Sequence, residues 1–371
     1  MPVSEMKGQA KKTIQNGDIL FSEIRPKNKR YAYVDVTNSE DYVVSTKLMV
    51  LRNKTKDVLT KYIYYFLTYE ETLNYLQMRA ENRICSFPQI TFDVLKPLVI
   101  KVPSLVEQQK IIDIISALDA KIELNNRINA ELESLAKSIY DYWFVQFDFP
   151  FDFAQGKPSA DGKPYKSSGG EMVYVEELKR KIPAGWKVDS LWKIANYFNG
   201  LPMQNNRPTD NNYLRVIKIR EMNEGFSENT ELAKADIPKE AIVEDGDILF
   251  SWSATLDIKM WTQGKGALNQ HIFKVTSNKF PKTFYYYELK NYLNHFKMMA
   301  ERRKTTMGHI TQEHLKQSRI VIPPIQLVNQ VHTMLTPMFE KHILLEKENQ
   351  QLTQLRDWLL PMLMNGQVSI K

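Results

Sequence analysis

Basic, amide and hydroxyl side chains recur in clusters at loop-like positions of this chain. Arg and Lys suit phosphates, Arg also matches the edge of guanine, and Asn or Gln matches the edge of adenine. The residues that we select are Arg25, Lys27, Lys29, Arg30, Arg83, Ser86 and Gln89 in the first half, and Lys218, Arg220, Trp252, Lys259, Asn269, Gln270, His271, Arg303, Lys304, Thr305, Thr306 and His309 in the second. They predict contacts with a nucleic acid. The alternative for any single residue is a solvated charged loop, but the clusters recur at the same positions in both halves.

The overall charge of the chain favours a polyanionic partner without proving one. The 371 residues include 50 Lys and Arg against 43 Asp and Glu, which gives a net charge of +7. Many basic proteins bind no nucleic acid, so this excess has to be weighed with other features. A hydrophobic content of 43% is typical of a globular protein and excludes a disordered chain.

The sequence contains no recognisable catalytic motif. The 14 glycines are not spaced as in a phosphate-binding loop or a dinucleotide-binding turn. His309 and His314 do not have the spacing of a zinc site, and the single cysteine, Cys85, excludes a disulfide framework. We expect Cys85 to be a small buried hydrophobe, and we expect no catalytic residue, metal or cofactor in this chain.

One tetrapeptide imitates a catalytic motif. Asp148-Phe149-Pro150-Phe151 is similar to the Asp/Asn-Pro-Pro-Phe/Tyr tetrapeptide of amino-methyltransferases. The first proline of that motif is missing, and no glycine-rich adenosylmethionine loop precedes it. We therefore interpret the segment as an aromatic exit from a helix.

The chain contains a long internal repeat. Residues 16–22 (NGDILFS) return as residues 245–251 (DGDILFS), and residues 83–91 (RICSFPQIT) return as residues 303–311 (RKTTMGHIT). Two matches at such a long spacing indicate a duplicated domain rather than an array of small units. Short aromatic and β-branched runs broken by Gly, Asn and Pro predict strands joined by turns in each copy, including a turn at each Gly-Asp.

Each copy continues in the same order. A helical pattern covers residues 60–75 in the first copy and 282–299 in the second. An extended run that contains proline follows, at residues 98–103 and 319–324. The repeat therefore predicts two similar α/β (α+β) domains.

A long helix is predicted directly after each extended run, with apolar positions that alternate in steps of four and three. This spacing indicates a coiled-coil seam. The seam positions are Ile111, Ile115, Leu118, Ile122, Asn125, Asn129, Leu132, Ala136, Ile139 and Trp143 in the first helix, and Val331, Leu335, Met338, His342, Leu345, Asn349, Leu352, Arg356, Leu359 and Leu363 in the second. Because neither helix has a partner in its own half, we predict that the two pair with each other, antiparallel.

The predicted domain plan has five parts. They are a first globular domain at residues 1–103, a long helix at 104–147, a linker at 148–183, a second globular domain at 184–323 and a second long helix at 324–371. Residues 148–172 of the linker are rich in Gly, Ser, Pro and Lys, which predicts a flexible surface connection. The stretch ahead of Asp18 is much shorter than the stretch from Gly185 to Asp247. The first domain is thus expected to be a shortened variant or to lack its natural start.

In combination, these segments resemble the specificity (S) subunits of type I restriction–modification systems. The resemblance rests on the duplicated strands, on residues 107–144 (EQQKIIDIISALDAKIELNNRINAELESLAKSIYDYWF) and on residues 183–200 (PAGWKVDSLWKIANYFNG). It implies two target-recognition domains that each read half of a split site in double-stranded DNA. Two long antiparallel helices would separate these domains and dock two modification (M) subunits. It further implies that adenosylmethionine belongs to the M subunits and that ATP and Mg belong to restriction (R) subunits.

The resemblance implies a non-catalytic, sequence-specific DNA-recognition subunit. No stretch approaches the about 18 uninterrupted apolar residues of a membrane helix, and the N-terminus lacks an apolar signal core, so we expect a cytoplasmic protein away from membranes. Two alternatives stay open: a coiled-coil protein–protein adaptor that reads no DNA, and a self-sufficient DNA methyltransferase. We expect the second domain to dominate sequence reading, with Arg303 and its neighbours carrying part of it.

Overall fold

The computed structural model describes residues 10–82, 88–302, 309–368 and 370, and it divides into two compact units. Unit 1 consists of residues up to 124 together with residues from 349 onward, and unit 2 consists of residues 125–348. The long helices α4 (Leu105–Tyr140) and α9 (Ile325–Met364) each contribute to both units. Each unit has its own hydrophobic clusters.

Unit 1 contains a small antiparallel sheet with the strand order β3-β2-β5. These strands are β2 (Ile19–Ser22), β3 (Tyr31–Tyr33) and β5 (Leu48–Leu51), and a separate pair joins β1 (Ala10–Thr13) to β4 (Val43–Ser45). The other elements are η2 (Pro26–Asn28), η3 (Ser39–Asp41), α1 (Thr60–Thr68), α2 (Glu70–Glu81) and α3 (Phe92–Leu95). Ile19, Phe21 and Met49 of the sheet pack on Leu73 and Leu76 of α2.

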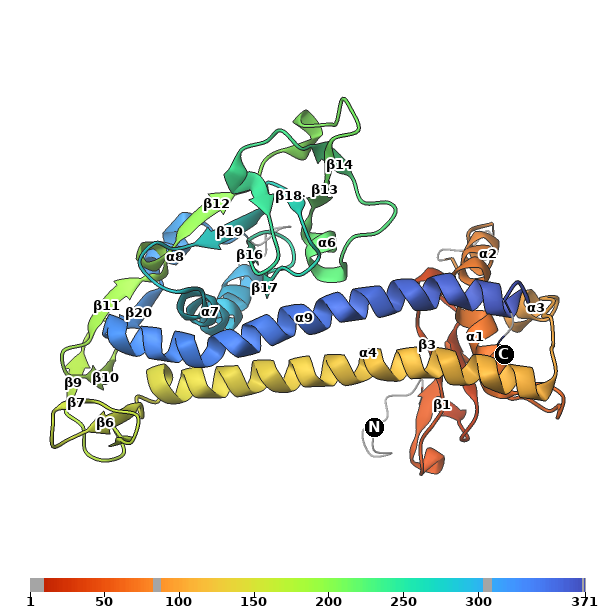
Figure 1. Cartoon of the computed structure of the whole chain (residues 1–371), viewed down its shortest axis with the longest axis horizontal. Coiled ribbons are helices and arrows are strands. Elements are labelled where there is room, and N and C mark those ends of the chain that lie inside the picture. Colours follow the sequence, from red (N-terminus) through yellow and green to blue (C-terminus); the bar gives the residue numbers. More distant parts are fainter. Residues whose placement is uncertain (1–9, 83–87, 303–308, 369, 371) are drawn as a thin grey trace. The chain divides into compact units, whose positions relative to one another are not determined.

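Unit 2 contains two four-stranded sheets (Figure 1). The first has the order β12 (Asn196–Asn199), β19 (Ile272–Thr276), β16 (Ile248–Ser251) and β17 (Asp257–Met260), and the second has the order β14 (Leu232–Lys234), β13 (Tyr213–Ile217), β18 (Gly266–Leu268) and β15 (Ile242–Val243). A further pair joins β11 (Lys187–Ser190) to β20 (Arg319–Ile322). The helical elements are α5 (Leu191–Ile194), η5 (Met203–Asn205), α6 (Ile219–Glu224), η6 (Lys239–Ala241), α7 (Lys282–Arg302) and α8 (Gln312–Gln317).

The predicted repeat is confirmed down to single hydrogen bonds. Gly17 and Gly246 both adopt a left-handed backbone conformation, with φ of +87° and +85°, which glycine accommodates without steric cost. The N–H of Gly17 donates to the carbonyl oxygen of Val34 at 2.8 Å, and that of Gly246 donates to Trp261 at 2.7 Å. Each turn leads into the strand that its sequence predicts, β2 in unit 1 and β16 in unit 2.

The predicted helical seam is confirmed as well. Every predicted seam position is buried or half-buried, although Trp143 lies beyond α4 in the π-helical turn η4 (Asp141–Val145). In unit 1, Ile111 and Ile115 of α4 share one hydrophobic cluster with Leu360 and Leu363 of α9. The beginning of α4 thus meets the end of α9, which is the antiparallel arrangement.

Polar seam residues fix the register of this pairing. In unit 1, Arg356 Nη1 donates to a carboxylate oxygen of Asp119 at 3.0 Å. In unit 2, Asn129 Nδ2 donates to Glu346 Oε1 at 2.8 Å. Partner numbers on α9 fall as residue numbers on α4 rise, as antiparallel helices require. A buried amide such as Asn129 lowers stability but disfavours other registers, because a shifted helix would leave it without its partner.

The linker predicted to be flexible is folded, so that prediction was wrong. Residues 148–183 form a three-stranded sheet of β6 (Pro150–Asp152), β7 (Lys157–Pro158) and β8 (Lys163–Pro164), and a hairpin of β9 (Met172–Val175) and β10 (Arg180–Pro183). Phe149 is buried and stacks on Tyr165 and Trp186, with ring centroids 4.7 and 5.2 Å apart. Packed aromatic rings order this segment despite its Gly- and Lys-rich composition.

Two other predicted elements differ from the structure. The helix expected at residues 60–75 is two helices, α1 and α2, because Tyr69 between them is extended with ψ of 156°. The extended run at residues 98–103 forms no strand, whereas its counterpart in unit 2 is β20. β20 pairs with β11, and the part of unit 1 that the structure describes contains no counterpart of β11. A single extended run cannot form the backbone hydrogen bonds of a sheet without a neighbouring strand.

Candidate nucleic-acid interface

An open pocket on unit 2 brings together residues that are far apart in the sequence. Its volume is about 440 Å³. The lining residues are Gln204, Arg207, Lys218, Ile219, Arg220, Glu231, Asn269, Gln270 and His271. Five of the residues selected from the sequence thus lie together, and we call this the Arg220 pocket. Gln204, in η5, and Arg207, in the loop after it, were missed because no sequence motif marks this segment.

The strand pairing of unit 2 explains how this pocket forms. β13 and β18 run parallel, with Ile217 opposite Leu268. Lys218 and Asn269 directly follow these two strands, and they therefore lie side by side at the carboxyl ends of the strands. The N–H of Asn269 also donates to the carbonyl oxygen of Ile217 at 3.1 Å, which holds the two segments together.

Carboxylates pair with both cationic residues that follow β13: Lys218, directly before α6, and Arg220, in the first turn of α6. Arg220 donates from Nε and Nη2 to Oε1 of the buried Glu221 at 3.0 and 2.6 Å. This hydrogen-bonded pair raises the pKa of Arg220 and uses two of the five N–H groups of its guanidinium. Lys218 pairs with Glu231 and lowers the pKa of that carboxyl. The Arg220 side chain is thus held in place before any ligand arrives.

A second group of predicted residues is built from rings. The indole of Trp252 contacts the imidazoles of both His271 and His309, with ring centroids 5.6 and 5.7 Å away. Trp252 Nε1 donates to Oδ1 of Asn199, a residue that the sequence did not suggest, at 2.9 Å. His271 belongs to this cluster and to the Arg220 pocket, so the two groups adjoin.

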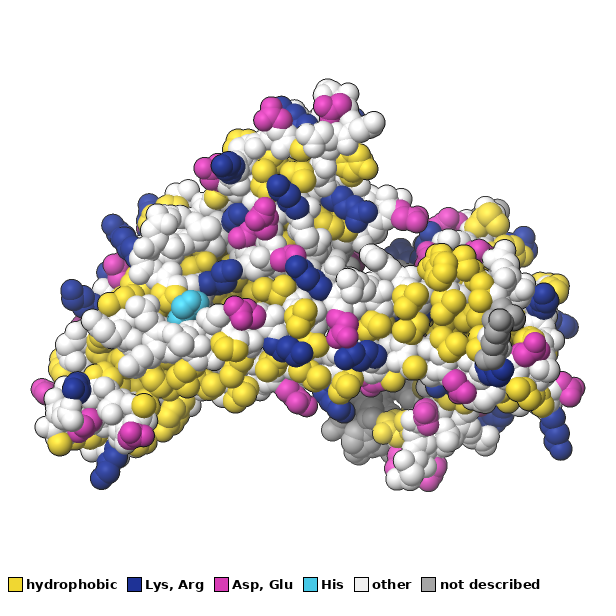
Figure 2. Space-filling model, viewed as in Figure 1, with side chains coloured by type: hydrophobic (Ala, Val, Ile, Leu, Met, Phe, Trp, Pro, Cys, Tyr) yellow, Lys and Arg dark blue, Asp and Glu magenta, His cyan; other side chains and the backbone are white. Residues whose placement is uncertain are grey.

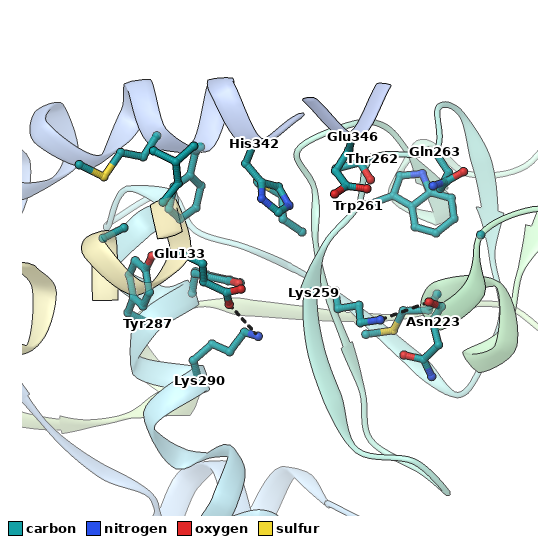
Figure 3. Close-up of a pocket in the computed structure, with 18 of the residues that line it drawn as sticks. Glu133, Asn223, Lys259, Trp261, Thr262, Gln263, Tyr287, Lys290, His342 and Glu346 are labelled. Atoms are coloured by element: carbon teal, nitrogen blue, oxygen red, sulfur yellow. Dashed lines mark hydrogen bonds and ion pairs between the residues drawn. The ribbon is translucent and has the colours of Figure 1, made fainter. Parts of the chain in front are cut away.

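Lys259 does not line the Arg220 pocket. Its Nζ lies 3.8 Å from a carboxylate oxygen of Asp257 and donates to the carbonyl oxygen of Asn223 at 3.4 Å. Figure 3 shows it instead in a pocket of about 400 Å³, where Lys290 pairs with Glu133 at 3.4 Å. This second pocket is lined by four glutamates and two lysines among other residues, so Lys259 lies apart from the Arg220 pocket, and its contact with DNA stays a prediction.

Four of the five basic residues selected in the first half lie on one exposed loop of unit 1. Arg25, Lys27, Lys29 and Arg30 surround η2 between β2 and β3, and all are exposed. The N–H of Arg25 donates to the carbonyl oxygen of Pro88 at 3.0 Å, and Ile24 forms an isolated bridge with Gln89. The loop and Gln89 are therefore neighbours, as expected for parts of one surface.

Several predicted residues lie outside the described parts of the chain. They are Arg83, Cys85, Ser86, Arg303, Lys304, Thr305 and Thr306. Where the structure is described, no group of three or more His, Cys, Asp and Glu side chains is placed to hold a metal ion. No described helix combines the length and the apolar character that crossing a membrane requires.

The tetrapeptide that imitates a methyltransferase motif has a structural role. Asp148 is buried, and its carboxylate accepts hydrogen bonds from the N–H and the Oγ of Ser167, both at 2.7 Å. Phe149 and Phe151 pack in the aromatic cluster of the folded linker. These contacts support the interpretation of the segment as an aromatic exit from α4.

Net charge alone does not mark the interface. On the face that Figure 2 shows, Lys and Arg side chains are interspersed with Asp and Glu. The interface therefore has to be inferred from the geometry of particular side chains, such as those of the Arg220 pocket.

Comparison with known proteins gives a consistent result. The family described as "Type I restriction modification DNA specificity domain" matches residues 3–134 and 183–354, one match in each copy of the repeat. The chain is 31% identical over 415 aligned positions to the Type I restriction enzyme HindI specificity subunit of Haemophilus influenzae, covering 99% of this chain and 90% of that protein. It is 26% identical over 331 positions to the MjaIX specificity subunit of Methanocaldococcus jannaschii, covering 85% and 70%.

A solved structure has a similar fold. The S subunit of a type I restriction–modification system from M. genitalium aligns with a TM-score of 0.52 at 15% identity, covering 95% of this chain and 84% of that one. At this identity the likeness concerns the fold, and it agrees with two globular domains and long antiparallel helices. The family match and the identity to the Haemophilus protein go further: this chain belongs to the family of type I restriction–modification DNA specificity subunits.

Proposed function

We propose that this chain is the non-catalytic subunit that reads DNA sequence for a type I restriction–modification complex. The observation that carries this proposal is the Arg220 pocket, where an Arg held by a buried carboxylate lies beside the amides Asn269 and Gln270. These groups match the hydrogen-bonding edges of guanine and adenine in the major groove. Because Arg220 is already oriented, contact with a base costs little additional side-chain entropy.

The remaining site residues divide by the chemistry that they offer. Trp252, His271, His309 and the missed Gln204 and Arg207 adjoin or line the Arg220 pocket, and we assign them to the same DNA-facing surface. Lys218 and the exposed loop of Arg25, Lys27, Lys29 and Arg30 are assigned to phosphates, which position the protein without reading sequence. Lys259, Gln89, and the predicted residues outside the described parts, including Arg303, keep their proposed role as DNA contacts.

In the proposed organisation, residues 1–103 and 184–323 are recognition domains and residues 104–147 and 324–371 are spacer helices. Two linked readers bind a split site more tightly than either alone, because the second binding event has a high effective concentration. Residues 148–183 serve as a folded connection between the first spacer helix and the second recognition domain.

We assign catalysis to partner subunits. Two M subunits would dock on the spacer helices and supply adenosylmethionine for adenine-N6 methylation, and R subunits would supply the ATP- and Mg-dependent steps. The expected location of the complex is the cytoplasm, where its DNA is found.

The proposal is tested by mapping methylated adenines in cells that carry this gene with its M partner. The expected result is one bipartite sequence for the wild type and relaxed specificity at one base pair for Arg220→Ala. Glu221→Gln is the matched control, because it keeps the guanidinium but weakens the ion pair that orients it, and we expect a smaller loss. Methyl transfer by the purified chain without an M subunit would contradict the non-catalytic role. DNA binding that does not weaken with salt would favour the adaptor alternative.

A further inference from the structure

Arg220 presents one particular edge of its guanidinium to a ligand. Nε and Nη2 of Arg220 donate to Oε1 of Glu221 at 3.0 and 2.6 Å, so the edge that these two nitrogens form is occupied. A guanidinium carries five N–H groups, and its second straight edge has one N–H on each of Nη1 and Nη2. Because the Arg220 side chain is 53% exposed, this second edge can face a ligand.

Glu221 is itself held in one position. It is 2% exposed, and its other oxygen, Oε2, accepts a hydrogen bond from the backbone N–H of Lys218 at 3.3 Å. This bond belongs to the capping box at the start of α6. Each carboxylate oxygen therefore has its own partner, and rotation of the carboxylate would break both contacts. The second edge of the Arg220 guanidinium thus points in a fixed direction before DNA arrives.

The charges around Arg220 favour a neutral ligand over a phosphate. Hydrogen bonding to Glu221 raises the pKa of Arg220 most, and the nearby carboxylates of Glu224 and Glu231 raise it further. The Lys and Arg side chains among the described residues that line the pocket are Arg207, Lys218 and Arg220. Three cations therefore face three carboxylates, and a phosphate that reached Arg220 would meet those negative charges as well. The edge of a base carries acceptors without a net charge.

We propose that Arg220 reads a guanine in the major groove, donating from Nη1 and Nη2 to its O6 and N7, and that Glu221 is the residue that positions it. Guanine presents two neighbouring acceptors there, whereas adenine presents an acceptor beside a donor and thymine a single acceptor. Two parallel N–H groups therefore match guanine and no other base. This inference rests on the DNA-reading function proposed above, and it assigns the base that the Arg220 pocket recognises.

The test uses the full-length chain with its M partner, and duplexes that carry the bipartite sequence found by adenine mapping. Each guanine is replaced in turn by 7-deazaguanine, which has a C–H group in place of N7. In a second set, each guanine is replaced by inosine, which keeps O6 and N7 but lacks the amino group in the minor groove. We expect 7-deazaguanine at the base that Arg220 reads to lower affinity about tenfold, because one charge-assisted hydrogen bond is lost. Inosine at that base should leave the affinity unchanged.

Arg220→Ala identifies the base in question. In this variant the loss of affinity caused by 7-deazaguanine should disappear at one position, because the donor is gone. Arg30→Ala is the matched control: it removes an exposed arginine of unit 1, and the loss at that position should persist. A recognised sequence without guanine, a 7-deazaguanine effect that is the same in Arg220→Ala at every position, or an equal effect of inosine would each overturn the proposal. Sequence-specific binding that persists in those cases would leave the DNA-reading function intact.

Glu221→Gln tests the positioning role. Glutamine keeps an oxygen that can accept the bond from Lys218 but carries no charge. The effect of 7-deazaguanine should shrink, because the guanidinium is held less firmly. Binding to a duplex of unrelated sequence should become tighter, because a carboxylate near the DNA is neutralised. A residue that only supports the fold would weaken binding to both duplexes, so weaker binding to the unrelated duplex would overturn the role of Glu221. Wild-type binding without any sequence preference would contradict the proposed function itself.

Discussion

The two globular domains share a backbone plan but differ in the side chains that it displays. In unit 2 the N–H of Trp252 donates to the carbonyl oxygen of His271 at 3.4 Å, and in unit 1 the N–H of Glu23 donates to that of Lys47 at 3.0 Å. The same backbone bond therefore joins Trp252 and His271, whose rings meet edge to face, in one domain, and Glu23 and Lys47, which carry a carboxylate and an ammonium group, in the other. Duplication has preserved the scaffold, while the surface chemistry has diverged.

A second difference concerns the elements themselves. The Arg220 pocket depends on η5, β13 and the loop between β18 and β19. The described part of unit 1 contains no counterpart of η5 or β13, so it has no scaffold for an equivalent pocket. The sheet beneath the Arg220 pocket is thus retained in unit 1, while the segments that line the pocket have no counterpart among its described residues. That the second domain dominates sequence reading stays a prediction.

The largest effect that would test the comparison is in the cores. Phe250 is fully buried and stacks on Phe296 with ring centroids 6.0 Å apart, and its counterpart Phe21 is 1% exposed. Phe250→Ala should cost about 3–5 kcal/mol of unfolding free energy. Phe21→Ala should cost less, because side chains packed against its cluster, such as Leu51, are only half-buried and leave more room for the cavity to collapse. Urea unfolding followed by hydrogen exchange in each unit measures both values, and a larger cost for Phe21→Ala would contradict the comparison.

DNA affinity provides the next test. Arg220→Ala should weaken binding to the matched duplex by about 1–3 kcal/mol and reduce discrimination at one base pair. Arg30→Ala, on the exposed loop of unit 1, should weaken binding equally for matched and mismatched duplexes. Binding isotherms on both duplexes separate the two behaviours. Loss of specificity in Arg30→Ala would show that the first domain reads bases as well.

The response to pH should also distinguish the units. Burial raises the pKa of Glu288 in α7 to about 7, although the hydroxyl of Tyr140 donates to its carboxylate at 2.6 Å. Because this folded-state pKa lies above the ordinary value of 4.5, the stabilisation from proton binding is complete below that value and is lost as pH rises through 7. Unfolding free energy of unit 2 should therefore fall between pH 5 and pH 8.

Glu288→Gln is the control for this pH dependence. It keeps an oxygen that can accept the Tyr140 hydrogen bond but cannot ionise, so the stability of unit 2 should become flatter over the same range. Residues 60–68, which form α1, the first of the two unit 1 helices that correspond to α7, include no Asp or Glu. Thermal unfolding at several pH values checks this prediction, and an unchanged slope in the variant would assign the effect to other groups.

The smallest expected effect is on the surface of unit 1. Lys29 Nζ lies 3.6 Å from a carboxylate oxygen of Glu70, and both side chains are more than half exposed. Lys29→Ala should change stability by less than about 1 kcal/mol, because water and salt screen such a pair. If Lys29 contacts a phosphate, the salt dependence of DNA binding should decrease by about one unit of slope. No change in that slope would place this loop away from the DNA.

The sequence by itself determined the features that depend on local pattern. The steps of four and three identified the seam positions of both long helices, at residues 111–143 and 331–363. The helical period alone decides which side chains share a face. The turns at Gly17 and Gly246 could be predicted because glycine adopts a left-handed backbone conformation without steric cost. Together with the long repeat, these patterns were sufficient for the fold class and the antiparallel helices.

Only the tertiary structure decided which distant segments meet. The Arg220 pocket exists because β13 lies parallel to β18, and no local pattern encodes that pairing or points to Gln204 and Arg207. The linker is folded because its aromatic residues, such as Phe149, pack against Trp186. Residues 98–103 have strand-forming composition but no strand, because a strand is stabilised by hydrogen bonds to a neighbour, and that neighbour is specified elsewhere in space.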